Sequence, residues 1–345
     1  MVDTVKYKPH LDVTDLFLLA QFDGRKADYN IPEYALDDYG RDYTERVAQL
    51  QADGYLRFAE PKEALQTLTI PKLKEILREH GQKISGNKDE LITRITANIA
   101  AENFSAKVPQ VLVATAAGRR ELETRTAYLE NRQENYGFLN SEIARLEGTV
   151  APEEILERLF AREISACGTR HDFGSLYIKY FSWRRYLKKR GRTTEALTAL
   201  LSAVYIKLTG MEDGNSVTDY QSLSYFFTDT CWRELDAERT VLKLSDEKLC
   251  ALFNQAVKQT AKVTFSYFTV ADMQEIILER LRGEENLLEK FAPRRREPQE
   301  NSPAYTYFQP ASLRRPIEIS TVGNTASGCL LPCLMIFLTV LALCK

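Results

Sequence analysis

The stretch that most constrains the fold of this 345-residue chain spans residues 65–99 and contains two short apolar patterns of helical spacing. Apolar residues that recur every three or four positions place an apolar stripe along one side of a helix. Because each stripe needs a partner surface, we expect the two helices to pack against each other. The stripes consist of Leu68, Leu73, Ile76 and Leu77 in the first segment and of Leu91, Ile92 and Ile95 in the second.

Residues at the predicted helix ends favour this arrangement. Thr69, followed by a proline in the first turn, is expected to cap the first helix. Asn87, with Glu90 three residues later, forms a capping-box pattern for the second helix. Gly81 and Gly86 lie in the connection, where residues without a side chain allow a sharp turn. The segment is therefore predicted to be a compact helix-loop-helix.

This segment resembles the SAP motif, a small helix-extended loop-helix module that binds DNA, and the resemblance covers about a tenth of the chain. Two features depart from the family: Gln82 replaces a usually apolar residue, and four acidic residues leave the segment only slightly basic. The resemblance implies DNA binding of modest affinity, and the alternative is a helix pair used for packing or for contact with protein. The matching positions are Leu68, Thr69, Leu73, Leu77, Gly81, Ser85, Gly86, Lys88, Leu91 and Arg94, and the acidic residues are Glu75, Glu79, Asp89 and Glu90.

The resemblance also implies which residues contact DNA. In SAP modules, contacts to the DNA backbone are expected from the loop and from both helix N-termini, where unpaired N–H groups attract phosphate. Contacts of this kind carry little sequence information, so we expect little discrimination between DNA sequences. The corresponding residues are Lys72, Lys74, Lys83, Ser85, Gly86, Asn87 and Lys88.

Two strand-like segments flank the predicted helix pair. Helices are predicted over residues 13–22 and 41–52 with a polar loop between them, and the second helix leads into the apolar segment 55–59. A further strand is predicted over 110–115. The pattern L-x-x-x-G-Y-L before a strand resembles the recognition helix and first wing strand of winged-helix domains. We therefore predict one compound domain over residues 10–150, with the SAP-like segment (65–100) inserted between two antiparallel wing strands; the alternative is two independent modules.

Residues 151–291 show helical patterns without a strong strand pattern. The part from 185 to 206 resembles one tetratricopeptide-type helical hairpin, but no repeat of about 34 residues follows, so an irregular helical bundle is predicted. Its basic run is interpreted as a solvated helix face, with a secondary contact to phosphate or anionic lipid as the alternative. Helices are predicted near 152–165, 173–190, 193–208, 218–236, 245–260 and 269–281, and the run comprises Arg184, Arg185, Lys188, Lys189, Arg190 and Arg192.

The C-terminal part combines a polar stretch with an apolar one. Residues 292–327 hold five prolines and no periodic pattern, which predicts a disordered linker. Residues 328–344 carry no charge and would form a helix about 25 Å long, at the short end of what crosses a bilayer. Arginines precede this run, so the positive-inside tendency predicts a C-terminal membrane anchor with the main domains in the cytoplasm. The alternatives are a buried core helix and an interfacial segment.

Composition limits the function classes that remain. A net charge of -2 and a pI near 6.1 argue against binding nucleic acid by bulk charge. Three histidines and scattered cysteines give no zinc pattern, and no phosphate loop or nucleophile motif occurs. We therefore expect no metal, no cofactor and no enzymatic activity.

The combined expectation is a mainly α protein that binds DNA with low specificity at the cytoplasmic face of a membrane. The order of its parts resembles uncharacterised SAP-domain proteins of bacteria and their mobile elements. The alternative function is a membrane-bound adaptor that binds protein partners through its SAP-like segment and through the hairpin of its helical domain, and that does not bind nucleic acid.

Overall fold

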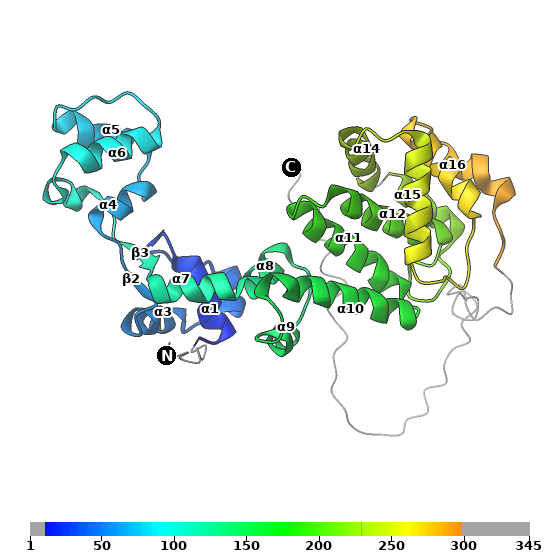
Figure 1. Ribbon diagram of the computed structural model, residues 1–345, viewed down its shortest axis with the longest axis horizontal. Helices are drawn as coiled ribbons and strands as arrows, with labels where there is room; N and C mark the ends of the chain where they lie inside the picture. Colours follow the sequence, from blue (N-terminus) through cyan, green and yellow to red (C-terminus); the bar gives the residue numbers. More distant parts are fainter. Residues whose placement is uncertain (1–10, 229, 299–345) are drawn as a thin grey trace, which may run out of the picture.

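The computed structural model describes residues 11–228 and 230–298 and confirms a mainly helical fold (Figure 1). The described residues form an elongated body. The predicted helix pair lies at one end, a small sheet with its own helices lies next to it, and a larger helical region forms the other end. Among the described residues, buried apolar side chains form three clusters, each centred in one of these parts.

The N-terminal unit packs short helices against a small sheet. Asp12 caps the first helix, because its side chain accepts a hydrogen bond from the N–H of Asp15 at 2.8 Å. The buried side chains of Leu18, Leu19 and Phe22 then face the sheet residue Leu112 and the other helices of this unit. Its elements are α1 (Val13–Phe22), β1 (Arg25–Lys26), α2 (Leu36–Tyr39), α3 (Tyr43–Ala52), β2 (Leu56–Phe58), β3 (Val111–Ala114) and α7 (Ala116–Thr124), with a short 3-10 helix at Glu33–Ala35.

The three strands form an antiparallel sheet in the order β1-β3-β2. Leu56 pairs with Ala114 and Phe58 with Leu112, which confirms the predicted pairing of segments 55–59 and 110–115. Strand β1 was missed and lies in the predicted polar loop. Its two residues are both charged and exposed, so they lack the apolar alternation that reveals a strand.

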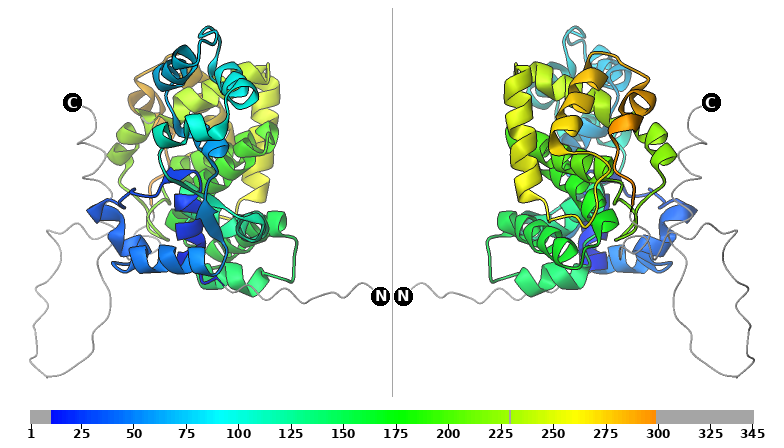
Figure 2. Two further views of the ribbon diagram at one scale, coloured as in Figure 1. Left: turned by 90° about the vertical axis from the view of Figure 1, so that its left-hand side faces the viewer. Right: turned by 90° about the vertical axis from the view of Figure 1, so that its right-hand side faces the viewer.

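The predicted helix pair is inserted between β2 and β3. In the view from this end of the molecule (Figure 2, left), its cyan helices lie above the blue helices of the N-terminal unit. Both ends of the insertion therefore connect to neighbouring strands of one sheet. The inserted elements are α4 (Pro61–Ala64), α5 (Ile70–Glu79) and α6 (Lys88–Asn98), with short 3-10 helices at Leu65–Thr67, Ala101–Asn103 and Ser105–Lys107.

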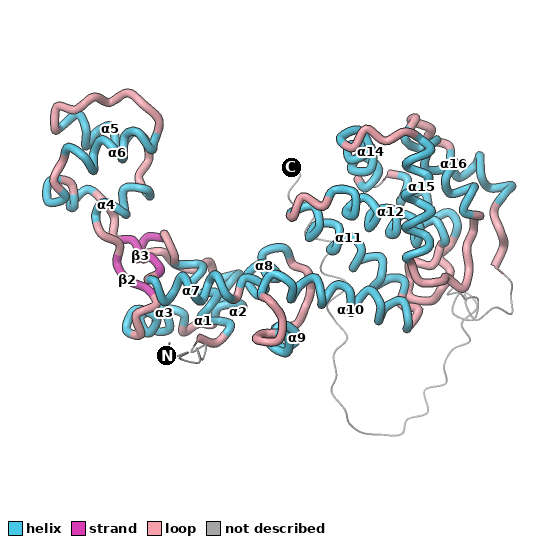
Figure 3. Tube along the Cα trace, in the orientation of Figure 1, coloured by secondary structure: helices cyan, strands magenta, loops and turns pink. Residues whose placement is uncertain are grey.

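The remaining described residues form the helical region, which contains no named strand in its described part (Figure 3). Its central helix, α12, is rich in alanine and leucine and is buried on nearly all sides, as expected for a helix without a polar face. The elements are α8 (Thr126–Glu134), α9 (Asn140–Leu146), α10 (Ile155–Thr169), α11 (Phe173–Lys189), α12 (Thr193–Thr209), α13 (Leu223–Phe227), α14 (Cys231–Val241), α15 (Asp246–Gln259), α16 (Val270–Leu281) and α17 (Leu287–Phe291). Short 3-10 helices lie at Pro152–Glu154, Tyr220–Ser222 and Ala292–Arg294.

The helix predicted over residues 218–236 was wrong as one continuous element. The structure has a 3-10 helix followed by α13 and α14. The Thr228 hydroxyl donates to the carbonyl of Tyr225 at 2.8 Å, and the Trp232 indole donates to that of Phe226 at 2.9 Å. Side-chain donors thus occupy carbonyls at the end of α13 that a continuing helix would use.

The buried clusters do not follow the predicted domain limit at residue 150. Helices α8 and α9 lie before this limit, yet Tyr128, Phe138 and Ile143 belong to the cluster of the helical region. The shared cluster does not test the division of the chain into 10–150 and 151–291, which stays a prediction. The winged-helix resemblance of the N-terminal unit also stays a prediction.

The basic run at the end of α11 joins helices to one another. Arg184 is buried and pairs with Glu234 and Glu238 of α14. Arg185 differs from the rest of the run, because its guanidinium lies 5.8 Å from the centroid of the Tyr136 ring. With these internal partners, the geometry does not favour a secondary phosphate or lipid contact. The other pairs are Lys188 with Glu238, Lys189 with Glu134, Arg190 with Glu130, and Arg192 with Glu157 and Glu195.

Two sequence predictions concern the C-terminal part. Residues 292–298, the start of the predicted disordered linker, lie against the helical region, where Arg294 pairs with Asp272 and Glu275. The rest of that linker and the predicted anchor (328–344) lie outside the described residues. Among the residues that the structure does describe, no helix combines the length and apolar character needed to span a bilayer.

Candidate nucleic-acid interface

The helix pair encloses a small apolar core of its own. All predicted stripe residues are buried there, which confirms the predicted packing of the two helices. Phe104, which follows α6, is fully buried and completes this core. Sequence reasoning missed Phe104 because it is a single apolar residue between polar neighbours, outside both periodic patterns.

The two helix starts differ in their capping. At α6, the Asn87 side chain accepts from the N–H of Glu90 at 3.0 Å, and the Glu90 carboxylate accepts from the N–H of Asn87 at 3.1 Å, which confirms the predicted capping box. At α5, Thr69 occupies the predicted cap position and a proline lies in the first turn, but the threonine side chain makes no capping hydrogen bond. Pro71 lacks an N–H, which leaves this end with fewer donors to satisfy.

Both helix starts retain N–H groups that can donate hydrogen bonds to an anion. Within the described part of the chain, no acceptor is recorded for the N–H groups of Ile70 and Lys72 in α5 or of Lys88 and Asp89 in α6. Such groups carry the positive end of the helix dipole. The two starts are therefore suited to hold phosphate oxygens.

Lys88 connects these two helix starts. Its Nζ donates to the backbone carbonyl of Gln66, just before α5, at 2.5 Å. The lysine is half-buried. An ammonium has three N–H donors, so Lys88 can hold this carbonyl and still donate to an anion placed between the helix starts.

Two of the other three predicted lysines are more accessible than Lys88. Lys72 and Lys83 are exposed and Lys74 is half-buried, and none of them has an ion-pair partner among the described residues. The carboxylate of Glu79 is paired with Lys107, whereas Glu75 and Asp89 remain exposed. Between residues 61 and 107 the chain carries eight basic and six acidic side chains. The segment is therefore only weakly basic as a whole, and at the start of α6 Asp89 and Glu90 offset the charge of Lys88.

Arg94 holds the loop between the two helices. The sequence identifies Arg94 as a position of the SAP motif, but Arg94 was not predicted to be a site residue. Arg94 Nη1 donates to the carbonyls of Lys83 at 2.5 Å and of Ser85 at 3.0 Å. Its sequence signal was its match to the SAP motif, which does not indicate the contact with the loop carbonyls. Arg94 therefore positions the loop residues beside the start of α6.

Gly86 is required at its place in this loop. Its φ of +132° lies in a region that residues with a side chain rarely adopt. A Cβ at this position would also lie 2.4 Å from Oε2 of Glu90, the oxygen used in the capping box. The loop, the cap and the start of α6 thus form one continuous arrangement.

Residues 64–100 match the family model of the SAP domain. The match lies within one residue of the predicted segment at both ends, and it confirms the SAP part of the resemblance. No curated protein matches the chain. The resemblance of the remaining order to bacterial proteins stays an interpretation. The inserted residues 61–107, from α4 to the last short 3-10 helix before β3, are called the SAP segment below.

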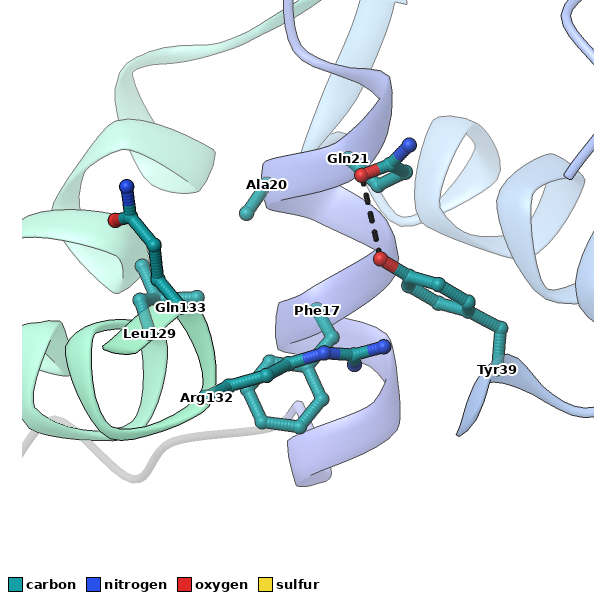
Figure 4. A pocket seen from close by; sticks show the side chains of 7 residues that line it. All are labelled: Phe17, Ala20, Gln21, Tyr39, Leu129, Arg132 and Gln133. Carbon is teal, nitrogen blue, oxygen red and sulfur yellow. Dashed lines mark hydrogen bonds between the residues drawn. The ribbon is translucent and has the colours of Figure 1, made fainter. Parts of the chain in front are cut away.

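A separate cavity of about 410 Å³ lies between α1, α2 and α8, outside the SAP segment (Figure 4). The guanidinium of Arg132 lies 4.3 Å from the centroid of the Phe17 ring and 4.2 Å from that of Tyr39, and it also pairs with Asp38 at 3.1 Å. The Tyr39 hydroxyl donates to Gln21 at 3.2 Å. These contacts hold α8 against the N-terminal unit. The residues around the cavity therefore have a structural role. The described residues contain no cluster suited to a metal ion.

Proposed function

We propose that the SAP segment binds the phosphate backbone of DNA with low sequence specificity, and that the protein acts by binding rather than by catalysis. The observation that carries this proposal is the SAP match at 64–100. It is supported by two helix starts with unpaired N–H groups, which Lys88 brings together. Exposed Lys72 and Lys83 add charge without internal partners in the described chain.

The N-terminal unit offers no second surface of this kind on α3, the helix compared with a recognition helix. The ends of α3 expose Asp42, Glu45 and Asp53, and its Arg46 is already paired with Asp12 and Asp15. Exposed carboxylates repel phosphate. We therefore assign the DNA contact to the SAP segment rather than to α3.

The test is a titration of a labelled duplex with the full chain, followed by fluorescence anisotropy at several salt concentrations. With about two to four phosphate contacts, the slope of log affinity against log salt should be about -2 to -4. Replacing Lys72 and Lys83 by glutamate should reduce the magnitude of that slope by about two. Lys88 is left unchanged in this test because it also holds the Gln66 carbonyl.

A matched control reverses two exposed lysines elsewhere, Lys258→Glu with Lys262→Glu, for which no ion pair is recorded in the described chain. This control carries the same change in net charge and should bind as the wild type does. If Lys72→Glu with Lys83→Glu binds no more weakly than the control, or if the wild-type chain does not bind DNA at low salt, the adaptor function replaces this proposal.

We further propose, from the hydropathy of residues 328–344, that the protein is anchored to a membrane with its main domains in the cytoplasm. The full chain should then stay with membranes during carbonate extraction, and a chain truncated after Thr325 should not. A full chain recovered entirely in the soluble fraction would contradict the anchor and would leave the DNA proposal unaffected.

A further inference from the structure

Two short connections join the SAP segment to the sheet, and nearly all of their residues make hydrogen bonds or packing contacts. On the outgoing side, the N–H of Ala59 donates to the carbonyl of Val111 at 2.7 Å, and α4 begins two residues later. On the return side, Val108 packs against the SAP core, while the carbonyl of Gln110 accepts the N–H of Ala27 at 2.9 Å. Only one residue, Pro109, lies between these last two contacts, and its ring fixes φ.

An ion pair crosses the same junction. Arg57, on β2, donates from Nη1 and Nη2 to the two carboxylate oxygens of Glu63, in α4, at 2.7 and 2.8 Å. Glu63 also accepts the N–H of Glu60 at 2.8 Å. The hydrogen bonds from Arg57, together with the one from the Glu60 N–H, lower the pKa of Glu63 to about 2, so the pair is ionised at neutral pH. The pair lies at the surface, with 42% of the Arg57 and 37% of the Glu63 side chain exposed, and its two parallel hydrogen bonds define a direction that a single hydrogen bond does not.

We propose that Arg57 and Glu63 are positioning residues of the DNA interface, which hold the SAP segment in one direction relative to the sheet. The protein then engages DNA as a rigid extension of its N-terminal unit rather than through a tethered module. The functional meaning of this inference rests on the proposed DNA binding, but the rigid junction can be measured without DNA. Because the SAP segment lies at one end of the body (Figure 1), its fixed direction sets how the helical region projects from the duplex.

The experiment measures one distance across the junction in the full chain. Keto amino acids are incorporated at Thr44 in α3 and Thr93 in α6, both exposed, and are coupled to nitroxides so that the native cysteines do not react. Double electron-electron resonance should give one narrow distance distribution for the wild type. Arg57→Gln and Glu63→Gln should each broaden it at least twofold.

The variants separate the junction from other effects. Glutamine at position 63 can still accept the N–H of Glu60, so Glu63→Gln weakens the ion pair while keeping the cap. Arg57→Lys keeps the charge without the two-pronged geometry and should give an intermediate width. The matched control is Arg46→Gln, which removes an arginine paired with Asp12 and Asp15 inside the N-terminal unit and should leave the distribution unchanged. Thermal unfolding of each variant verifies that it is folded.

A broad distribution in the wild type would overturn the inference, and so would widths that do not change in Arg57→Gln and Glu63→Gln. Adding duplex DNA should leave the mean wild-type distance unchanged, because the SAP segment already has its binding direction, and a shifted mean would also contradict the proposal. Failure of the wild-type chain to bind DNA contradicts the proposed function instead, and this result is read from the separate anisotropy titration.

Discussion

At the scale of single residues, the least expected feature is the burial of the Glu121 carboxyl group. It lies in α7, is fully buried, and neither of its carboxyl oxygens has a hydrogen-bond partner. Its nearest cation is Arg125, at 3.8 Å, which donates instead to Glu147 and to the carbonyl of Leu11. Burial raises the pKa of Glu121, and the neighbouring charge of Glu147 adds to this effect. The position therefore favours a neutral side chain.

Replacing Glu121 by glutamine tests this conclusion. A carboxyl whose pKa is higher in the folded than in the unfolded state stabilises the fold below its unfolded pKa, and stability is lost as pH rises through the folded pKa. Glutamine does not titrate, so the free energy of unfolding of Glu121→Gln, relative to the wild type, should be higher at pH 8 than at pH 5. Urea unfolding at both values measures this difference.

The control for this prediction is Glu123→Gln in the same helix, where the carboxylate is exposed. Its free energy of unfolding relative to the wild type should be the same at both pH values, because this substitution removes no buried carboxyl group. An equal pH response of the two variants would show that burial of Glu121 does not govern its ionisation.

At the scale of elements, the sequence reveals a helix where apolar residues recur with helical spacing. Helix α1 begins and ends at the predicted residues, and α5 and α6 bury the predicted stripes. The two-residue strand β1 and the break between α13 and α14 depend on backbone pairing and on side chains that occupy carbonyls, which leave no periodic pattern. Arg94 was visible as a motif position, but its contact with the loop carbonyls requires the folded loop.

Phe104 tests the SAP core at this scale. Replacing it by alanine should destabilise the SAP segment by about 3–5 kcal/mol, because a fully buried aromatic ring leaves a cavity that a small core fills poorly. Hydrogen exchange followed by mass spectrometry should show faster exchange in peptides from α5 and α6, with α12 unchanged. Ile84→Ala, at a position that is 37% exposed, is the control and should have little effect. Unchanged hydrogen exchange in Phe104→Ala would show that Phe104 does not stabilise this core.

At the scale of the whole molecule, the three buried clusters are not equally separate. Helix α1 contributes Leu16 to the cluster of the helical region and Leu18 and Leu19 to that of the N-terminal unit. Arg132 strengthens the same joint by its contacts with Phe17 and Tyr39. The cluster of the SAP segment shares no residue with the other two. We therefore expect two units of unfolding, with the N-terminal unit and the helical region in one and the SAP segment in the other.

Leu16→Ala distinguishes this division from three independent units. Loss of a fully buried leucine costs about 2–5 kcal/mol, and a shared helix should pass that cost to both of its clusters. Hydrogen exchange should therefore accelerate in peptides from β3 and from α10, while α6 keeps its rates. Ile178→Ala, at a position that is 61% exposed in α11, is the control and should leave all three unchanged. Acceleration in α10 alone would indicate that the N-terminal unit is stable without the helical region. Acceleration in α6 would show that the SAP segment depends on the rest of the chain for its fold, so that its interface with DNA could not persist when the body unfolds.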